Sequence, residues 1–80
     1  MEELIMNKAR IKQLINWKKK AEELKEELES ILYDEQDYFD NMPENLQGSM
    51  KGMDSEEAIN QLEDAISTLE EAIDSVDNIT

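Results

Sequence analysis

The chain has 80 residues, of which 21 are acidic and 8 are basic, so its formal net charge is −13. Because it lacks both cysteine and histidine, disulfides, thiolate or imidazole zinc sites and Ser/His or Cys/His catalysis are excluded. A single domain of this length buries only about 60% of its chain surface and is marginally stable as a monomer. We therefore expect one small domain, residues 1–80, that gains stability from association.

No targeting or membrane segment is recognisable in the sequence. Glu2 and Glu3 stand where a signal peptide carries basic residues. Apolar runs stay well short of the ~20 residues that a membrane-spanning helix needs. The sequence therefore predicts a cytoplasmic protein without a membrane role.

The first predicted element is one long helix at about residues 2–41, a stretch without Gly or Pro that is rich in helix formers. Lys18, Lys25 and Glu35 interrupt its apolar stripe. They are expected either to extend their stems along apolar surface or to form a polar layer that sets the register. The apolar residues recur mostly at spacings of three and four: Leu4, Ile11, Leu14, Trp17, Ala21, Leu24, Leu28, Ile31, Leu32, Tyr38 and Phe39.

A loop is predicted at about residues 42–54. Pro43 disfavours helical geometry at Met42, so the first helix is expected to end near Asn41. Residues 43–47 are expected to form one helical turn, with Gly48 as its left-handed stop. The simplest role of this segment is to reverse the chain.

The second long helix is predicted at about residues 55–78, with Asp54 as its N-cap and Glu57 completing a capping pair. Three successive heptads have the same pattern of apolar positions: AINQLED, AISTLEE and AIDSVDN. They give an apolar stripe with alanines beside it, where another helix can approach closely. The stripe consists of Ile59, Leu62, Ile66, Leu69, Ile73 and Val76, and the alanines are Ala58, Ala65 and Ala72.

These elements predict an all-α, coiled-coil-like antiparallel hairpin that assembles into an oligomeric helical bundle. At 1.5 Å per residue the helices span roughly 60 Å and 36 Å, so the second ends near the level of Trp17 or Lys18. Residues 1–17 then lack a partner within the chain, which makes them an association site. The predicted partner interface is Leu4, Ile11, Leu14, Ile15 and Trp17. The predicted core is Leu24, Leu28, Ile31, Tyr38, Ile59, Leu62, Ile66, Leu69, Ile73 and Val76.

Charge is divided unequally along the chain. Residues 1–20 carry a net charge of +4, and residues 21–80 carry −17. Packing the basic segment of one chain beside the acidic second helix of another covers apolar surface and reduces repulsion. A homo-oligomer is therefore the expected state.

The sequence gives little support for a metal site, a catalytic site or a nucleic-acid-binding site. Asp34, Asp37 and Asp40 share one helix row, but neither an EF-hand loop nor a Glu-x-x-His pair is present, so we predict no metal or cofactor. A two-helix hairpin offers no cleft to shift carboxylate pKa values, which argues against an enzyme. The acidic body opposes direct nucleic-acid binding by the basic segment.

The acidic residues suggest an alternative function. Two rows follow the second helix at helical spacing, and such rows can imitate a phosphate backbone. This pattern leaves open an acidic DNA mimic that inhibits a host defence or DNA-processing protein. The rows are Glu56, Glu63, Glu70 and Asp77, and Glu57, Asp64 and Glu71.

The string YFDNMPENLQGS at residues 38–49, followed by the alanine and isoleucine heptads, resembles small uncharacterised acidic proteins encoded in phage and prophage regions of Gram-positive bacteria. The resemblance covers roughly residues 22–78 and implies a mobile-element context without a known activity. It singles out a possible recognition loop: Asn41, Pro43, Glu44, Asn45, Leu46 and Gln47. The prediction is therefore a non-catalytic protein-interaction or assembly protein of phage or prophage origin, with a possible host or phage protein partner.

Overall fold

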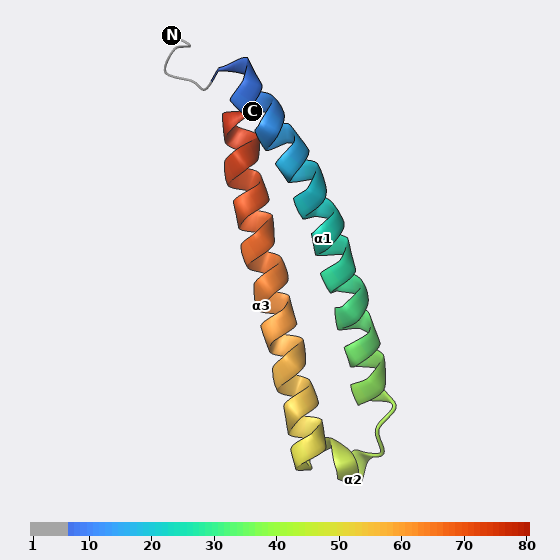
Figure 1. Ribbon diagram of the computed structural model, residues 1–80. Coiled ribbons are helices and arrows are strands. Elements are labelled where there is room, and N and C mark those ends of the chain that lie inside the picture. Colours follow the sequence, from blue (N-terminus) through green and yellow to red (C-terminus); the bar gives the residue numbers. More distant parts are fainter. Residues whose placement is uncertain (1–6) are drawn as a thin grey trace.

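The computed structural model describes residues 7–80, which form helices α1 (Lys8–Asp40), α2 (Glu44–Gln47) and α3 (Met50–Ile79). No strand occurs among these residues, so the all-α prediction is confirmed for the described part of the chain. The two long helices lie side by side and run in opposite directions, with α2 at the connecting end (Figure 1). Leu4 and the predicted start of the first helix lie outside the described residues.

Local signals explain the two ends of α1. The Asn7 side chain accepts a hydrogen bond from the Arg10 backbone N–H at 3.0 Å and caps the first turn. At the other end, the Asn41 N–H donates to the Asp37 carbonyl at 3.0 Å, two residues before Pro43. The predicted end near Asn41 therefore agrees with the structure.

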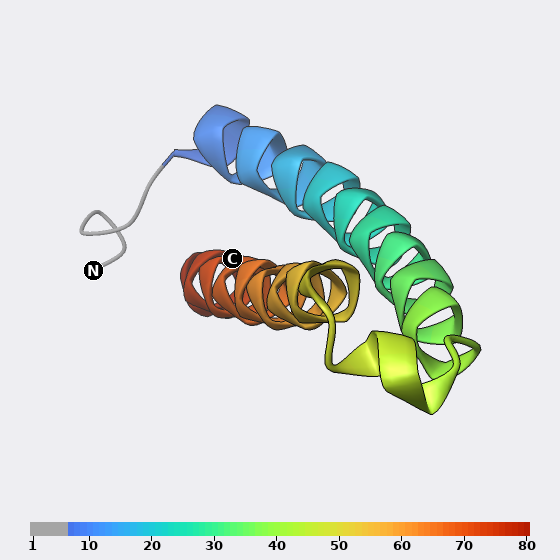
Figure 2. The ribbon, with the colours of Figure 1, turned by 90° about the horizontal axis from the view of Figure 1, so that it is seen from below.

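The connection is shorter than the predicted loop of residues 42–54. The expected turn is present as α2, directly after Pro43, and Figure 2 shows it beside the end of α1. The predicted left-handed stop is wrong, because Gly48 has a φ of −87°. The predicted cap is also wrong: α3 begins at Met50, its N-cap is Ser49, and Asp54 lies inside the helix.

Gly52 explains how α3 can begin so early. It is buried, and a Cβ at this position would lie 2.0 Å from the carbonyl oxygen of Gln47. Only glycine lets the first turn of α3 pack this closely on the backbone of α2. A residue that lowers helix propensity is thus required by tertiary contact, which the local sequence pattern does not reveal.

The contact between α1 and α3 is a continuous seam of heptad a and d positions, all buried or half-buried. Its most buried apolar residues are Ala21, Leu32, Ile66 and Ile73, each less than 10% exposed. The α1 side consists of Ile11, Leu14, Lys18, Ala21, Lys25, Leu28, Leu32, Glu35 and Phe39. The α3 side consists of Gly52, Ser55, Ile59, Leu62, Ile66, Leu69, Ile73 and Val76.

The seam confirms the predicted core on α3 but corrects it on α1. Leu28 is half-buried as expected. Leu24, Ile31 and Tyr38 are wrong as core residues, because they are 55%, 52% and 48% exposed. The helix turns the neighbouring stripe, which includes Lys25 and Glu35, toward α3, since those polar groups find partners there.

Candidate protein-interaction faces

Three polar contacts fix the register of the seam. Lys18 Nζ lies 2.5 Å from Asp77 Oδ1, and Lys25 Nζ lies 3.4 Å from Glu70 Oε2. Near the connecting end, Ser55 Oγ donates to Glu35 Oε2 at 2.6 Å.

The two lysine side chains are only 22% and 25% exposed, whereas their acidic partners are more than half exposed. The lysine stems therefore cover the seam while their ammonium groups reach carboxylates at its edge. Polar layers of this kind specify alignment more than they add stability.

One side of the helix pair is apolar. Trp17, Leu24, Ile31 and Tyr38 recur every seven residues on α1, each one position before a seam residue, and are 39% to 55% exposed. On α3 the equivalent residues are Ala58, Ala65, Ala72 and Ile79. In an antiparallel pair of helices, the residues that directly precede heptad position a on each helix lie on the same side of the seam. We call these eight residues the apolar face.

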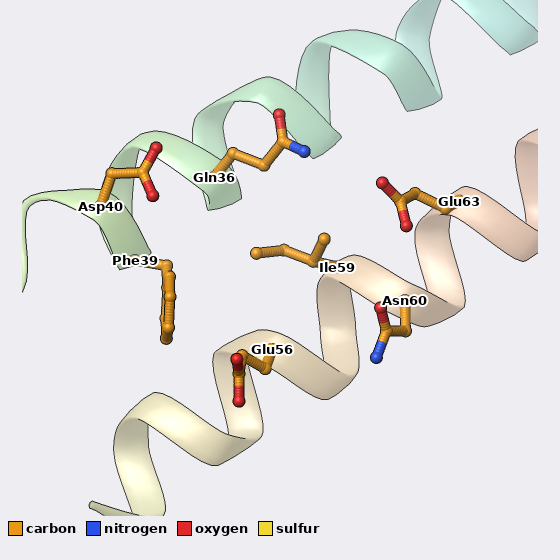
Figure 3. A pocket seen from close by; sticks show the side chains of 7 residues that line it. All are labelled: Gln36, Phe39, Asp40, Glu56, Ile59, Asn60 and Glu63. Carbon is orange, nitrogen blue, oxygen red and sulfur yellow. The ribbon is translucent and has the colours of Figure 1, made fainter. Parts of the chain in front are cut away.

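The opposite side of the seam is acidic. It carries Glu22, Glu29 and Gln36 from α1, and Glu56, Glu63, Glu70 and Asp77 from α3. Figure 3 shows one part of it, an open groove of about 420 Å³ between Gln36 and Asp40 on α1 and Glu56 and Glu63 on α3, with Ile59 pointing into the space between the helices. Among residues 7–80, no group of three or more His, Cys, Asp or Glu side chains is arranged to hold a metal ion.

The predicted partner interface divides between these surfaces. Ile11 and Leu14 are half-buried on the seam side of α1. Trp17 belongs to the apolar face, and Ile15, 49% exposed, lies on the acidic side. The ion pair between Lys18 and Asp77 places the end of α3 at the level expected from helix lengths.

The possible recognition loop contains one residue with a clear structural task. Gln47 is half-buried, and its Nε2 donates to the carbonyls of Phe39 at 3.2 Å and Met42 at 3.3 Å, satisfying groups at the end of α1. The other five predicted loop residues are exposed: Asn41, Pro43, Glu44, Asn45 and Leu46.

A shallow depression of about 400 Å³ adjoins the apolar face at the connecting end. It is lined by Tyr38, Asn41, Met42, Pro43, Leu46 and Lys51. Tyr38 belongs both to this depression and to the apolar face. The exposed apolar surface therefore continues past the end of α1 onto the connection.

Sequence reasoning missed the apolar face as a unit, because it assigned three of its large residues to the core. The signal was present: Trp17, Leu24, Ile31 and Tyr38 are spaced by seven residues, as are the three alanines.

Comparisons of the chain with protein-family models, with curated proteins and with solved structures found no match. None of the helices in residues 7–80 is both long enough and apolar enough to cross a membrane.

Proposed function

We propose that this chain is a non-catalytic protein-interaction and assembly protein whose antiparallel helices form a coiled-coil hairpin that associates through the apolar face. One observation supports this above all: five large apolar side chains on one side of the pair are 39% to 55% exposed. They are Trp17, Leu24, Ile31, Tyr38 and Ile79. Large exposed apolar side chains gathered on one side of a molecule are typical of interaction sites.

The free energy of burial indicates that association requires the whole apolar face. Full burial of one large apolar side chain stabilises by about 1.5–3 kcal/mol, so completing the burial of a half-exposed one contributes roughly 1 kcal/mol. Five such residues in each of two copies give roughly 10 kcal/mol, comparable with the estimated 4–15 kcal/mol cost of association. A charge introduced at the centre of the face is therefore expected to abolish association.

Sedimentation equilibrium of the purified chain tests the proposal. The wild type is expected to exceed the 9.3 kDa of one chain. Combined substitution of Leu24→Glu and Ile31→Glu is expected to give a helical monomer. Ser30→Glu with Ser67→Glu adds the same charge at exposed positions outside both surfaces and serves as the matched control. A folded wild-type monomer at all concentrations contradicts self-association.

We further propose a cytoplasmic setting in a phage or prophage, where a host or phage protein is an additional partner. This part rests on the resemblance of residues 38–49 and the following heptads. Pull-down from a bacterial host carrying such an element identifies the partner. Loss of the captured protein with the Leu24→Glu and Ile31→Glu variant would assign it to the apolar face.

A second candidate, an acidic DNA mimic, is favoured by the acidic side of the seam. Carboxylates of Glu22 and Glu29 on α1 flank that side together with the row on α3. A DNA mimic binds a basic protein, and nucleic acid displaces it with steep salt dependence. Binding that double-stranded DNA does not compete away would leave only the assembly function.

A further inference from the structure

We infer that the occupant of the apolar face is a second copy of this chain, placed so that α1 of each copy lies on α3 of the other with both connecting ends together. The inference rests on the proposed self-association and specifies its geometry. The product is a four-helix bundle with a two-fold axis parallel to the helices. Each helix then runs antiparallel to both of its neighbours.

The first support is a second uncharged strip on α3. From Ala58 to Ile79 none of the acidic residues of α3 falls on this strip, whose members alternate in spacing by three and four, and Asp54 occupies the same helix position one heptad before Gln61. Such spacing is the repeat by which a helix contacts a neighbour, so α3 carries one repeat for α1 and another for a further helix. The strip consists of Ala58, Gln61, Ala65, Thr68, Ala72, Ser75 and Ile79.

The second support is a matching strip on α1 with the same spacing. In it, large apolar residues alternate with charged ones. A helix strip of large residues packs best on a strip of small ones, because the backbones can then approach without voids. The strip consists of Trp17, Lys20, Leu24, Glu27, Ile31, Asp34 and Tyr38.

The register decides which residues meet. The contacts of Lys18 with Asp77 and of Lys25 with Glu70 place Leu24 at the level of Ala72. A two-fold axis parallel to the helices preserves these levels between copies. Leu24, Ile31 and Tyr38 then lie over alanines, and Trp17 lies over Ile79. Each charged residue of the α1 strip lies over an uncharged polar one: Lys20 over Ser75, Glu27 over Thr68 and Asp34 over Gln61.

Charge complementarity selects this arrangement over the other two-fold dimer. With the axis perpendicular to the helices, α3 lies beside α3, and two helices that each carry nine acidic residues become neighbours. With the parallel axis, Lys18, Lys19 and Lys20 lie at the level of the last turns of α3 of the other copy, which carry Asp74 and Asp77. The available area is also adequate. Thirty helical residues and two helix widths give roughly 900 Å² per copy, against about 800 Å² per partner in a standard interface.

Cysteine cross-linking tests the geometry cleanly, because the natural chain has no cysteine. Two single variants, Leu24→Cys and Ala72→Cys, are purified separately, mixed, equilibrated and oxidised. The mixed disulfide dimer is expected at a yield at least ten-fold above that of Ser30→Cys mixed with Ser67→Cys, whose positions are exposed and point away from the face. Circular dichroism establishes that each variant remains helical.

The outcomes separate the two proposals. A sedimentation dimer that cross-links Leu24→Cys to Ala72→Cys supports the arrangement. A sedimentation dimer without that product overturns the geometry and leaves self-association standing. A monomer in sedimentation overturns both and means that a different protein covers the apolar face.

Discussion

The two glycines are predicted to respond in opposite directions to replacement by alanine. At Gly52 a new Cβ lies 2.0, 2.5 and 2.7 Å from three backbone atoms of Gln47. Gln47 is itself held by its side-chain bonds to Phe39 and Met42, so its backbone does not retreat freely. Overpacking of this kind costs about 1–3 kcal/mol, and the better helix propensity of alanine offsets about 1 kcal/mol.

Because all three approaches are to backbone atoms at less than 3.0 Å, the cost falls in the upper part of that range, about 2–3 kcal/mol. The expected net loss for Gly52→Ala is therefore about 1–2 kcal/mol, or a fall in Tm of roughly 4–16 °C for a domain of this size. Gly48→Ala is the matched control, because nothing lies within 4 Å of its added Cβ and its φ of −87° suits alanine. It is expected to stabilise by about 0.4–1 kcal/mol. Thermal unfolding followed by circular dichroism at one fixed chain concentration measures both. A Gly52→Ala protein that melts at or above the wild-type temperature would refute the reasoning.

Three further predictions concern the cap, the polar layers and the net charge. Ser49→Ala is expected to destabilise by about 1 kcal/mol in urea unfolding and Asp54→Ala by less than about 0.5 kcal/mol; the reverse order would move the start of α3 to Asp54. Lys25→Met is expected to stabilise by about 1 kcal/mol while giving mixed species in sedimentation, because a register-setting layer is lost; a uniform, destabilised protein contradicts this. Raising NaCl from about 20 mM to about 500 mM is expected to raise Tm, since screening weakens the repulsion of a net charge of −13; a lower Tm means that attractive ion pairs dominate.

That the chain is helical, and roughly where its helices lie, can be predicted from local sequence signals. Residues 2–41 lack helix breakers, Pro43 ends the first helix, and the heptads from Ala58 mark the apolar stripe of the second. These signals are local, or they repeat along one helix, so no knowledge of neighbours was needed. The contact of Lys18 with Asp77 lies at the level expected for the end of the second helix, although α3 has 30 residues and begins before the predicted start at residue 55.

Which stripe of α1 faces α3 depends instead on how the two helices pack together. Hydrophobicity favoured Leu24, Ile31 and Tyr38, whereas the seam uses the stripe that contains Lys25 and Glu35, because α3 supplies partners for these polar groups. The start of α3 was hidden for a similar reason. Gly52 disfavours a helix by itself, yet it alone fits against the backbone of Gln47, and that contact exists only once α2 and α3 have packed together.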